Sequence, residues 1–87
     1  MNNNQVNKDY ISRINKAIDY IISNLDKELT LEQISSIANF SVFHFHRIFK
    51  SITNETLYKF IFRLRMEKAA SLLISHPGKS VFEVALD

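Results

Sequence analysis

Four side chains in the middle of the sequence have the chemistry to contact nucleic acid from one face of a helix. His46, Arg47 and Lys50 follow Phe43 by three, four and seven residues, and these offsets place side chains on the same helical face. A guanidinium can donate two hydrogen bonds to a guanine edge, an imidazole can donate or accept, and a phenyl ring can contact a thymine methyl. A lysine suits phosphate. The spacing therefore predicts a DNA-binding face.

Two flanking residues extend this candidate site. Ser41 suits both the N-cap of the helix and a hydrogen bond to phosphate. His44 lies nearer the flank of the face, where it either contacts phosphate or packs against the protein. We assign no DNA contact to Val42, because a basic or polar residue would serve better there. The candidate DNA-binding residues are thus Ser41, Phe43, His44, His46, Arg47 and Lys50.

Each base-contacting candidate also has a simpler alternative role. Arg47 could form a surface salt bridge with Glu32 or with an acidic residue of the first helix. Phe43 could be buried against the preceding helix, and His46 could contact phosphate instead of a base edge. On the sequence alone these alternatives stay open.

Composition argues against other kinds of functional site. The 87-residue chain has no cysteine, which excludes disulfides, zinc–thiolate sites and thiol catalysis. His44 and His46 are two residues apart, so on a helix they point to nearly opposite sides and do not form a metal site. The sequence has no nucleophile motif and no glycine-rich phosphate loop. We therefore expect no enzymatic activity, no cofactor and no bound metal ion.

The distribution of charge favours a polyanionic partner. Residues 41–79 carry seven of the eleven Lys and Arg side chains but two of the nine carboxylates, although the net charge of the chain is +2. Such a local excess favours binding to a polyanion, and an ordinary solvated helix face is the alternative. No segment resembles a membrane span or a secretion signal, so we expect a cytoplasmic protein with no membrane partner.

The elements that would position the site are all helical. The chain has one glycine and one proline, and its apolar residues recur at helical spacing. Five helices are predicted, over about residues 9–24, 31–38, 42–52, 57–75 and from 80 onward. The side chains expected in the core are Ile11, Ile14, Ile18, Ile21, Ile22, Leu25, Leu31, Ile34, Ile37, Ala38, Phe45, Ile48, Phe49, Ile52, Leu57, Phe60, Ile61, Leu64, Leu72, Leu73, Val81, Val84 and Ala85.

Turn residues mark the ends of these helices. Thr30 is predicted to cap the second helix, with Gln33 completing a capping box. Asn39 and Asn54 are predicted to adopt the left-handed conformation that ends the second and third helices. The Pro77-Gly78 pair is predicted to stop the fourth helix.

Five segments combine these features into a wider pattern: Leu29–Ile34, Ser41, Phe45–Lys50, Arg63–Ala70 with Leu72 and Leu73, and Ser80–Ala85. Together they resemble the DNA-binding domain of AraC-type bacterial transcription regulators, without gaps from about residue 10. The resemblance implies sequence-specific DNA binding, with base contacts from positions 43, 46 and 47. Asn39 and Asn54 depart from the family, which commonly has glycine at both turns.

The resemblance also implies a division of the chain into four parts. A flexible tail (residues 1–8) precedes a homeodomain-like helix-turn-helix unit of three helices (9–55), a linker helix (56–76) and the truncated beginning of a second helix-turn-helix unit (77–87). The residues from 57 to 75 would span about 28 Å, close to the ~34 Å between successive major-groove faces. We expect the second recognition helix to be missing, which would move DNA affinity toward the non-specific range.

The expected partners follow from this assignment. Double-stranded DNA is the principal partner, and the full-length protein is expected to contact RNA polymerase and to carry an effector-binding domain after Asp87. The unpaired apolar side of residues 81–86 predicts a homodimer or domain swap at high concentration. The alternative function is a helical protein-interaction or self-association module whose surface includes Phe43, Phe62 and Phe82.

Overall fold

A computed structural model of the chain describes residues 3–75 and residue 78. These residues form four helices, α1 (Asn3–Ser23), α2 (Leu31–Ile37), α3 (Val42–Thr53) and α4 (Leu57–Ser75), and contain no strand. The predicted all-α class is confirmed. The predicted fifth helix and the truncated second helix-turn-helix unit lie outside the described residues.

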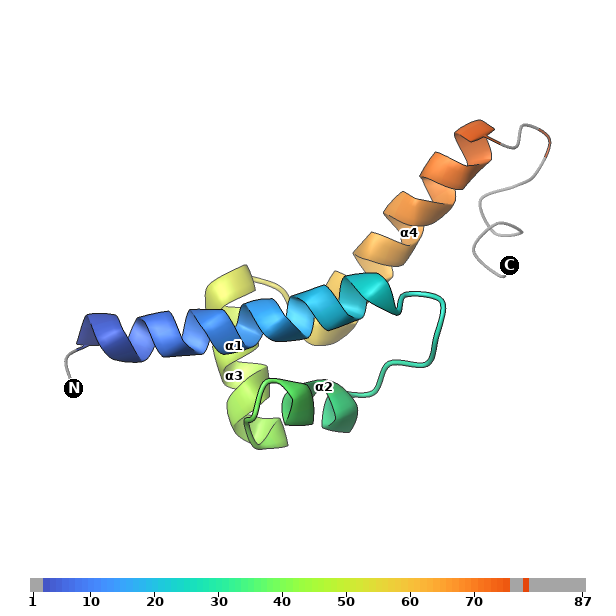
Figure 1. Ribbon diagram of the computed structural model, residues 1–87. Coiled ribbons are helices and arrows are strands. Elements are labelled where there is room, and N and C mark those ends of the chain that lie inside the picture. Colours follow the sequence, from blue (N-terminus) through green and yellow to red (C-terminus); the bar gives the residue numbers. More distant parts are fainter. Residues whose placement is uncertain (1–2, 76–77, 79–87) are drawn as a thin grey trace. The chain divides into compact units, whose positions relative to one another are not determined.

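The chain divides into two compact units, one ending at Leu57 and the other beginning at Tyr58. In the first unit α1, α2 and α3 pack against one another pairwise, with α2 and α3 consecutive and joined by a short turn (Figure 1). This is the three-helix arrangement expected of a helix-turn-helix unit.

Fully buried apolar side chains hold the three helices together. The side chains with no exposed surface are Ile14, Ala17 and Ile21 of α1, Ile34 of α2, and Phe45 and Phe49 of α3. Burying a large apolar side chain contributes roughly 1.5–3 kcal/mol, whereas a helix as short as α2, with 7 residues, is unstable by itself in water. Tertiary packing therefore stabilises α2 and fixes its place beside α3.

The buried stripe of α1 is narrower than predicted. Ile14 and Ile21 are buried as expected, but Ile11 and Ile22 are 45% and 55% exposed, and Ala17 lies in the core instead. Positions 14, 17 and 21 follow the spacing of three and four residues that defines one side of a helix. Ile11 and Ile22 lie beside this stripe rather than on it, so their predicted burial is wrong.

Two further core predictions are wrong near the ends of helices. Ile52 of α3 is 42% exposed and Leu72 of α4 is 37% exposed. Each lies within one turn of the last residue of its helix, where fewer neighbouring residues surround a side chain.

Helix α1 begins at Asn3, six residues before its predicted start at Asp9. Residues 3–8, which we expected to form a flexible tail, are therefore helical. Once a packed helix exists, each added residue gains a backbone hydrogen bond without a new nucleation cost. The Asn, Gln, Lys and Val residues in this stretch lower helix stability only by fractions of a kcal/mol each.

Side-chain caps begin α2 and α3 as predicted. The Thr30 hydroxyl accepts a hydrogen bond from the Gln33 backbone N–H at 3.1 Å, and the Ser41 hydroxyl accepts one from the His44 N–H at 3.2 Å. The capping box at α2 is only half formed, because the Gln33 side chain donates instead to the Tyr20 hydroxyl at 2.9 Å. That amide joins α2 to α1 rather than closing the cap.

The second unit contains nearly all of α4, a continuous helix of 19 residues. Phe60, Ile61 and Ala69 of α4 are buried, whereas Tyr58 and Phe62 are 78% and 56% exposed. The rings of this exposed pair stack with centroids 6.5 Å apart. None of the described helices combines the length and hydropathy needed to cross a membrane.

Candidate nucleic-acid interface

The turn between α2 and α3 is a Schellman motif. Ala38 caps α2, and Asn39 follows in the left-handed conformation with φ of 61°. The N–H of Phe40 donates to the Ser35 carbonyl and the N–H of Asn39 donates to the Ser36 carbonyl, both at 3.0 Å. These two bonds define the motif, and they set the chain direction in which α3 starts.

Asn54 ends α3 with the same backbone conformation. Its φ is 63°, and its N–H donates to the Lys50 carbonyl at 2.9 Å. The predicted left-handed conformation is thus confirmed at both Asn39 and Asn54. Asparagine enters this conformation more easily than other residues with a side chain.

The predicted DNA-binding face lies exposed on α3. Phe43, His46, Arg47 and Lys50 are all exposed, with Phe43 at 72%. On the other side of the helix, Phe45 and Phe49 have no exposed surface. The core thus anchors α3 by one side and leaves the aromatic and basic side free for a partner.

Two alternative roles can now be compared with the structure. Phe43 is not buried against α2, since most of its side chain is exposed. Arg47 forms no ion pair with Glu32 or any other carboxylate in the described part of the chain. Its guanidinium carbon lies 5.9 Å from the centre of the Phe43 ring instead.

The two flanking candidates differ from each other. Ser41 is exposed, and although its oxygen accepts the His44 N–H, its own O–H can still donate. His44 is half-buried, and its ring packs edge-on against Phe40 at 5.0 Å and Tyr10 at 5.6 Å between centroids. Of its two predicted roles, packing against the protein is the one observed.

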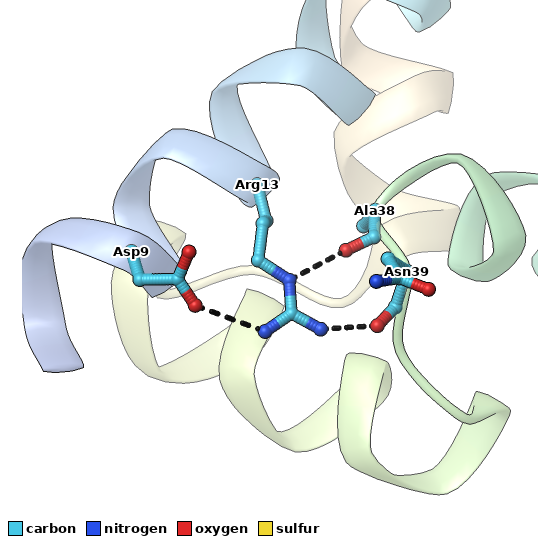
Figure 2. Close-up of polar contacts among 4 residues, drawn as sticks. All are labelled: Asp9, Arg13, Ala38 and Asn39. Carbon is cyan, nitrogen blue, oxygen red and sulfur yellow. Dashed lines mark hydrogen bonds and ion pairs between the residues drawn. The ribbon is translucent and has the colours of Figure 1, made fainter.

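Arg13, which the sequence did not single out, contacts the turn from α1. Its Nε donates to the Ala38 carbonyl at 2.9 Å and its Nη2 donates to the Asn39 carbonyl, while Nη1 pairs with Asp9 Oδ2 at 3.1 Å (Figure 2). The guanidinium carbon also lies 3.8 Å from the centre of the Phe40 ring. A single side chain thus contacts both residues of the turn and the ring that follows them.

A weak signal for Arg13 was present in the sequence. Arg13 precedes the buried Ile14, which places it at the edge of the inner side of α1. The last carbonyls of any helix, α2 included, lack an intrahelical donor. Which donor satisfies them depends on how α1 crosses the turn, and that is a tertiary property.

Comparison with known proteins connects this geometry to a family. Residues 34–87 match the sequence model of a family described as a helix-turn-helix domain, and the curated relatives include AraC-type transcription regulators. The chain belongs to the AraC-type helix-turn-helix family. Its relatives are named as transcription regulators and activators, and the self-association alternative is not favoured.

Three relatives illustrate the match of this AraC-type chain. It is 31% identical over 77 residues to the uncharacterized HTH-type transcriptional regulator YbfP of Bacillus subtilis, covering 88% of the chain and 26% of YbfP. It is 35% identical over 68 residues to the bifunctional transcriptional activator/DNA repair enzyme AdaA of the same species, covering 78% and 32% respectively. It is 34% identical over 67 residues to the multiple antibiotic resistance protein MarA of Escherichia coli, covering 77% and 52%.

The AraC-type chain spans about a quarter to about half the length of these relatives. Among its described residues, no group of three or more His, Cys, Asp or Glu side chains is placed to hold a metal ion.

Proposed function

We propose that α3 enters the major groove of double-stranded DNA and reads base sequence there. The observation that carries this proposal is the exposed face of Phe43, His46, Arg47 and Lys50 on a helix anchored from behind by two fully buried phenylalanines. A helix with an exposed polar and aromatic side fits the width of the major groove. The rigid core behind it would keep that side in a constant orientation.

The residues on the face divide into base and phosphate contacts. Arg47 is the main base-reading residue, because its guanidinium can donate two hydrogen bonds to guanine O6 and N7. Phe43 contacts a thymine methyl and His46 a base edge. Lys50 and Ser41 contact phosphates, which position the helix without reading sequence.

The beginning of α3 favours an approaching phosphate. Its first turn contains no acidic residue, and the first backbone N–H groups of a helix carry partial positive charge. Ser41 caps this end and keeps an O–H for donation. These features support placing a phosphate of the groove edge next to the N-terminus of α3.

For the chain as a whole we propose the arrangement that the AraC-type family suggests. Residues 9–55 form the first DNA-binding unit, residues 56–76 a linker helix, and residues 77–87 the beginning of a second unit. The length of α4, 19 residues or about 28 Å, supports a linker that reaches toward the next major groove. The family match, which continues to residue 87, supports the second unit.

Further partners belong to the same proposal. The relatives are two to four times longer than the matched segment, and the name of AdaA describes a transcriptional activator. We therefore propose that a full-length regulator adds an effector-binding domain and contacts with RNA polymerase, and that this segment can form a homodimer. The segment itself binds DNA in the cytoplasm without catalysis and without a cofactor.

Selection from random-sequence duplex DNA tests the proposal. The chain is expected to enrich a motif, to bind the enriched duplex more tightly than a scrambled duplex of equal length, and to lose affinity for both as salt rises. Failure to bind duplex DNA, together with self-association by sedimentation that does not depend on salt, would contradict it. Binding without any enriched motif would reduce the function to non-specific DNA binding.

A further inference from the structure

We propose that Arg13 is a positioning residue that sets the orientation of α3 on DNA, so that base discrimination depends on a side chain of α1. This inference rests on the proposed function of α3. Arg13 does not belong to the exposed face of α3, and it would act through the turn that precedes that helix.

The first supporting observation is the pair of hydrogen bonds from Arg13 to consecutive carbonyls, which we name the Arg13 fork. Inside the Schellman motif the carbonyls of Ser35 and Ser36 already have donors. The fork supplies donors to two later carbonyls of the turn, those of the consecutive residues Ala38 and Asn39 (Figure 2). A planar guanidinium can serve two neighbouring acceptors at once, whereas a lysine ammonium cannot reproduce that geometry.

The second observation is that the guanidinium is restrained on one face as well as along its edges. Its carbon lies 3.8 Å from the centre of the Phe40 ring. Its remaining nitrogen, Nη1, pairs with Asp9. All three nitrogens therefore have acceptors, and the side chain is 26% exposed. A side chain held in this way has little freedom to follow a displaced turn.

The third observation connects the Arg13 fork to α3 itself. The Phe40 ring packs edge-on against His44, and both rings pack edge-on against Tyr10 of α1, with centroids 5.0 to 5.6 Å apart. His44 lies in the first turn of α3, between the exposed Phe43 and the buried Phe45. The start of α3 is thus fixed to α1 through Phe40 and His44 as well as through the backbone of the turn.

The consequence is a difference between specific and non-specific binding. Bidentate hydrogen bonds to a base edge require well-defined positions and angles. A flexible lysine near a phosphate tolerates a small displacement, because its attraction is mainly that of a point charge. Loosening the start of α3 should therefore weaken discrimination by Arg47 and leave general affinity from Lys50 nearly unchanged.

The test compares Arg13→Lys with Asp9→Asn in the full 87-residue chain. Arg13→Lys keeps the charge and the methylene stem but removes the fork. Asp9→Asn removes the exposed ion pair and leaves the fork in place. The probes are the duplex enriched by the wild-type chain from random DNA and a scrambled duplex of the same composition. The measured quantity is the discrimination ratio, which is the dissociation constant for the scrambled duplex divided by that for the enriched duplex.

We expect Arg13→Lys to lower this ratio by about tenfold, as expected for the weakening of one bidentate base contact. Affinity for the scrambled duplex should change by less than about twofold, since the phosphate contacts and the net charge remain. Asp9→Asn should leave the ratio unchanged, because the amide oxygen can still accept from Nη1, the lost charge is at an exposed position and the fork stays in place. An equal loss on both duplexes, an unchanged ratio in folded Arg13→Lys, or the same loss in Asp9→Asn would overturn the inference.

Loss of folding must be separated from loss of orientation. Each variant is checked by far-UV circular dichroism, and trimethylamine N-oxide is added to all samples where needed because it favours the folded state. Arg13→Gln, whose amide can serve only one of the two carbonyls, is the second variant. A discrimination ratio that returns to the wild-type value once a variant is fully folded would show a purely structural role and overturn the inference.

The wild-type measurement separates this inference from the function on which it rests. If the wild-type chain enriches no motif, the proposed function of α3 fails and the inference falls with it. If the wild-type chain discriminates and both folded Arg13 variants do so equally well, the inference alone fails.

Discussion

The guanidinium of Arg47 lies over the ring of Phe43, one helical turn earlier on the exposed side of α3, with 5.9 Å from the guanidinium carbon to the ring centre. Arginine above an aromatic ring is a favourable arrangement within about 6 Å. Arg47 has no ion pair among the described residues, and this ring is the interaction that the structure shows for its guanidinium. The interaction favours rotamers that keep the guanidinium beside the ring.

Arg47→Ala should reduce discrimination between the selected duplex and a scrambled one. A bidentate contact to guanine contributes about 1–3 kcal/mol of discrimination, so the ratio of dissociation constants should fall by at least about fivefold. Arg47→Lys should recover general affinity but not discrimination, since an ammonium lacks the bidentate geometry. Fluorescence anisotropy with both duplexes measures the ratio. A loss of equal size on both duplexes would instead assign Arg47 to phosphate.

Lys50→Ala should weaken binding to all duplexes alike. Each phosphate contact adds about 0.9 to the slope of log affinity against log salt, so removal of Lys50 should lower the magnitude of that slope by about one unit. Lys16→Ala is the matched control, because Lys16 is an exposed cation on α1 outside the proposed interface. Identical slopes for the Lys50 and Lys16 variants would show that Lys50 does not contact phosphate.

Phe43→Ala and Phe45→Ala should separate binding from stability. Phe43 is 72% exposed, so its removal should change the free energy of unfolding by less than about 0.5 kcal/mol while weakening binding to the selected duplex. Phe45 has no exposed surface, and its truncation should lower stability by about 3–5 kcal/mol. Urea unfolding followed by circular dichroism compares the two. A large destabilisation by Phe43→Ala would place its ring in the core in solution.

The effect of an Asn39 substitution on stability should depend on whether the new residue tolerates the left-handed backbone conformation. At φ of 61° a residue with an ordinary side chain is strained by about 1–2 kcal/mol, so Asn39→Ala should lower stability by about 1 kcal/mol. Asn39→Gly should be tolerated, because glycine adopts this conformation freely. Asn15→Ala, at an exposed position inside α1, should not destabilise the chain, since alanine is the better helix former. Equal effects of Asn39→Ala and Asn39→Gly would exclude backbone strain as the cause.

Much of the local structure follows from the sequence. Thr30 and Ser41 cap their helices because a hydroxyl satisfies backbone N–H groups only two or three residues away. Asn39 and Asn54 are left-handed because few other residues with a side chain enter that conformation easily. The exposed side of α3 likewise follows from spacing along one helix. All of these features involve residues within a few positions of each other.

Features that depend on distant segments were decided by the tertiary structure. Ile11 and Ile22 satisfy the helical spacing almost as well as Ile14 and Ile21, but only the latter face α2 and α3. Gln33 has a local partner in its predicted capping box and bonds to Tyr20 instead. Arg13 is 25 and 26 residues from the carbonyls that it contacts. Spacing along a helix specifies which side chains share a side, but it does not specify which part of that side a neighbouring helix covers, because that depends on how the helices cross.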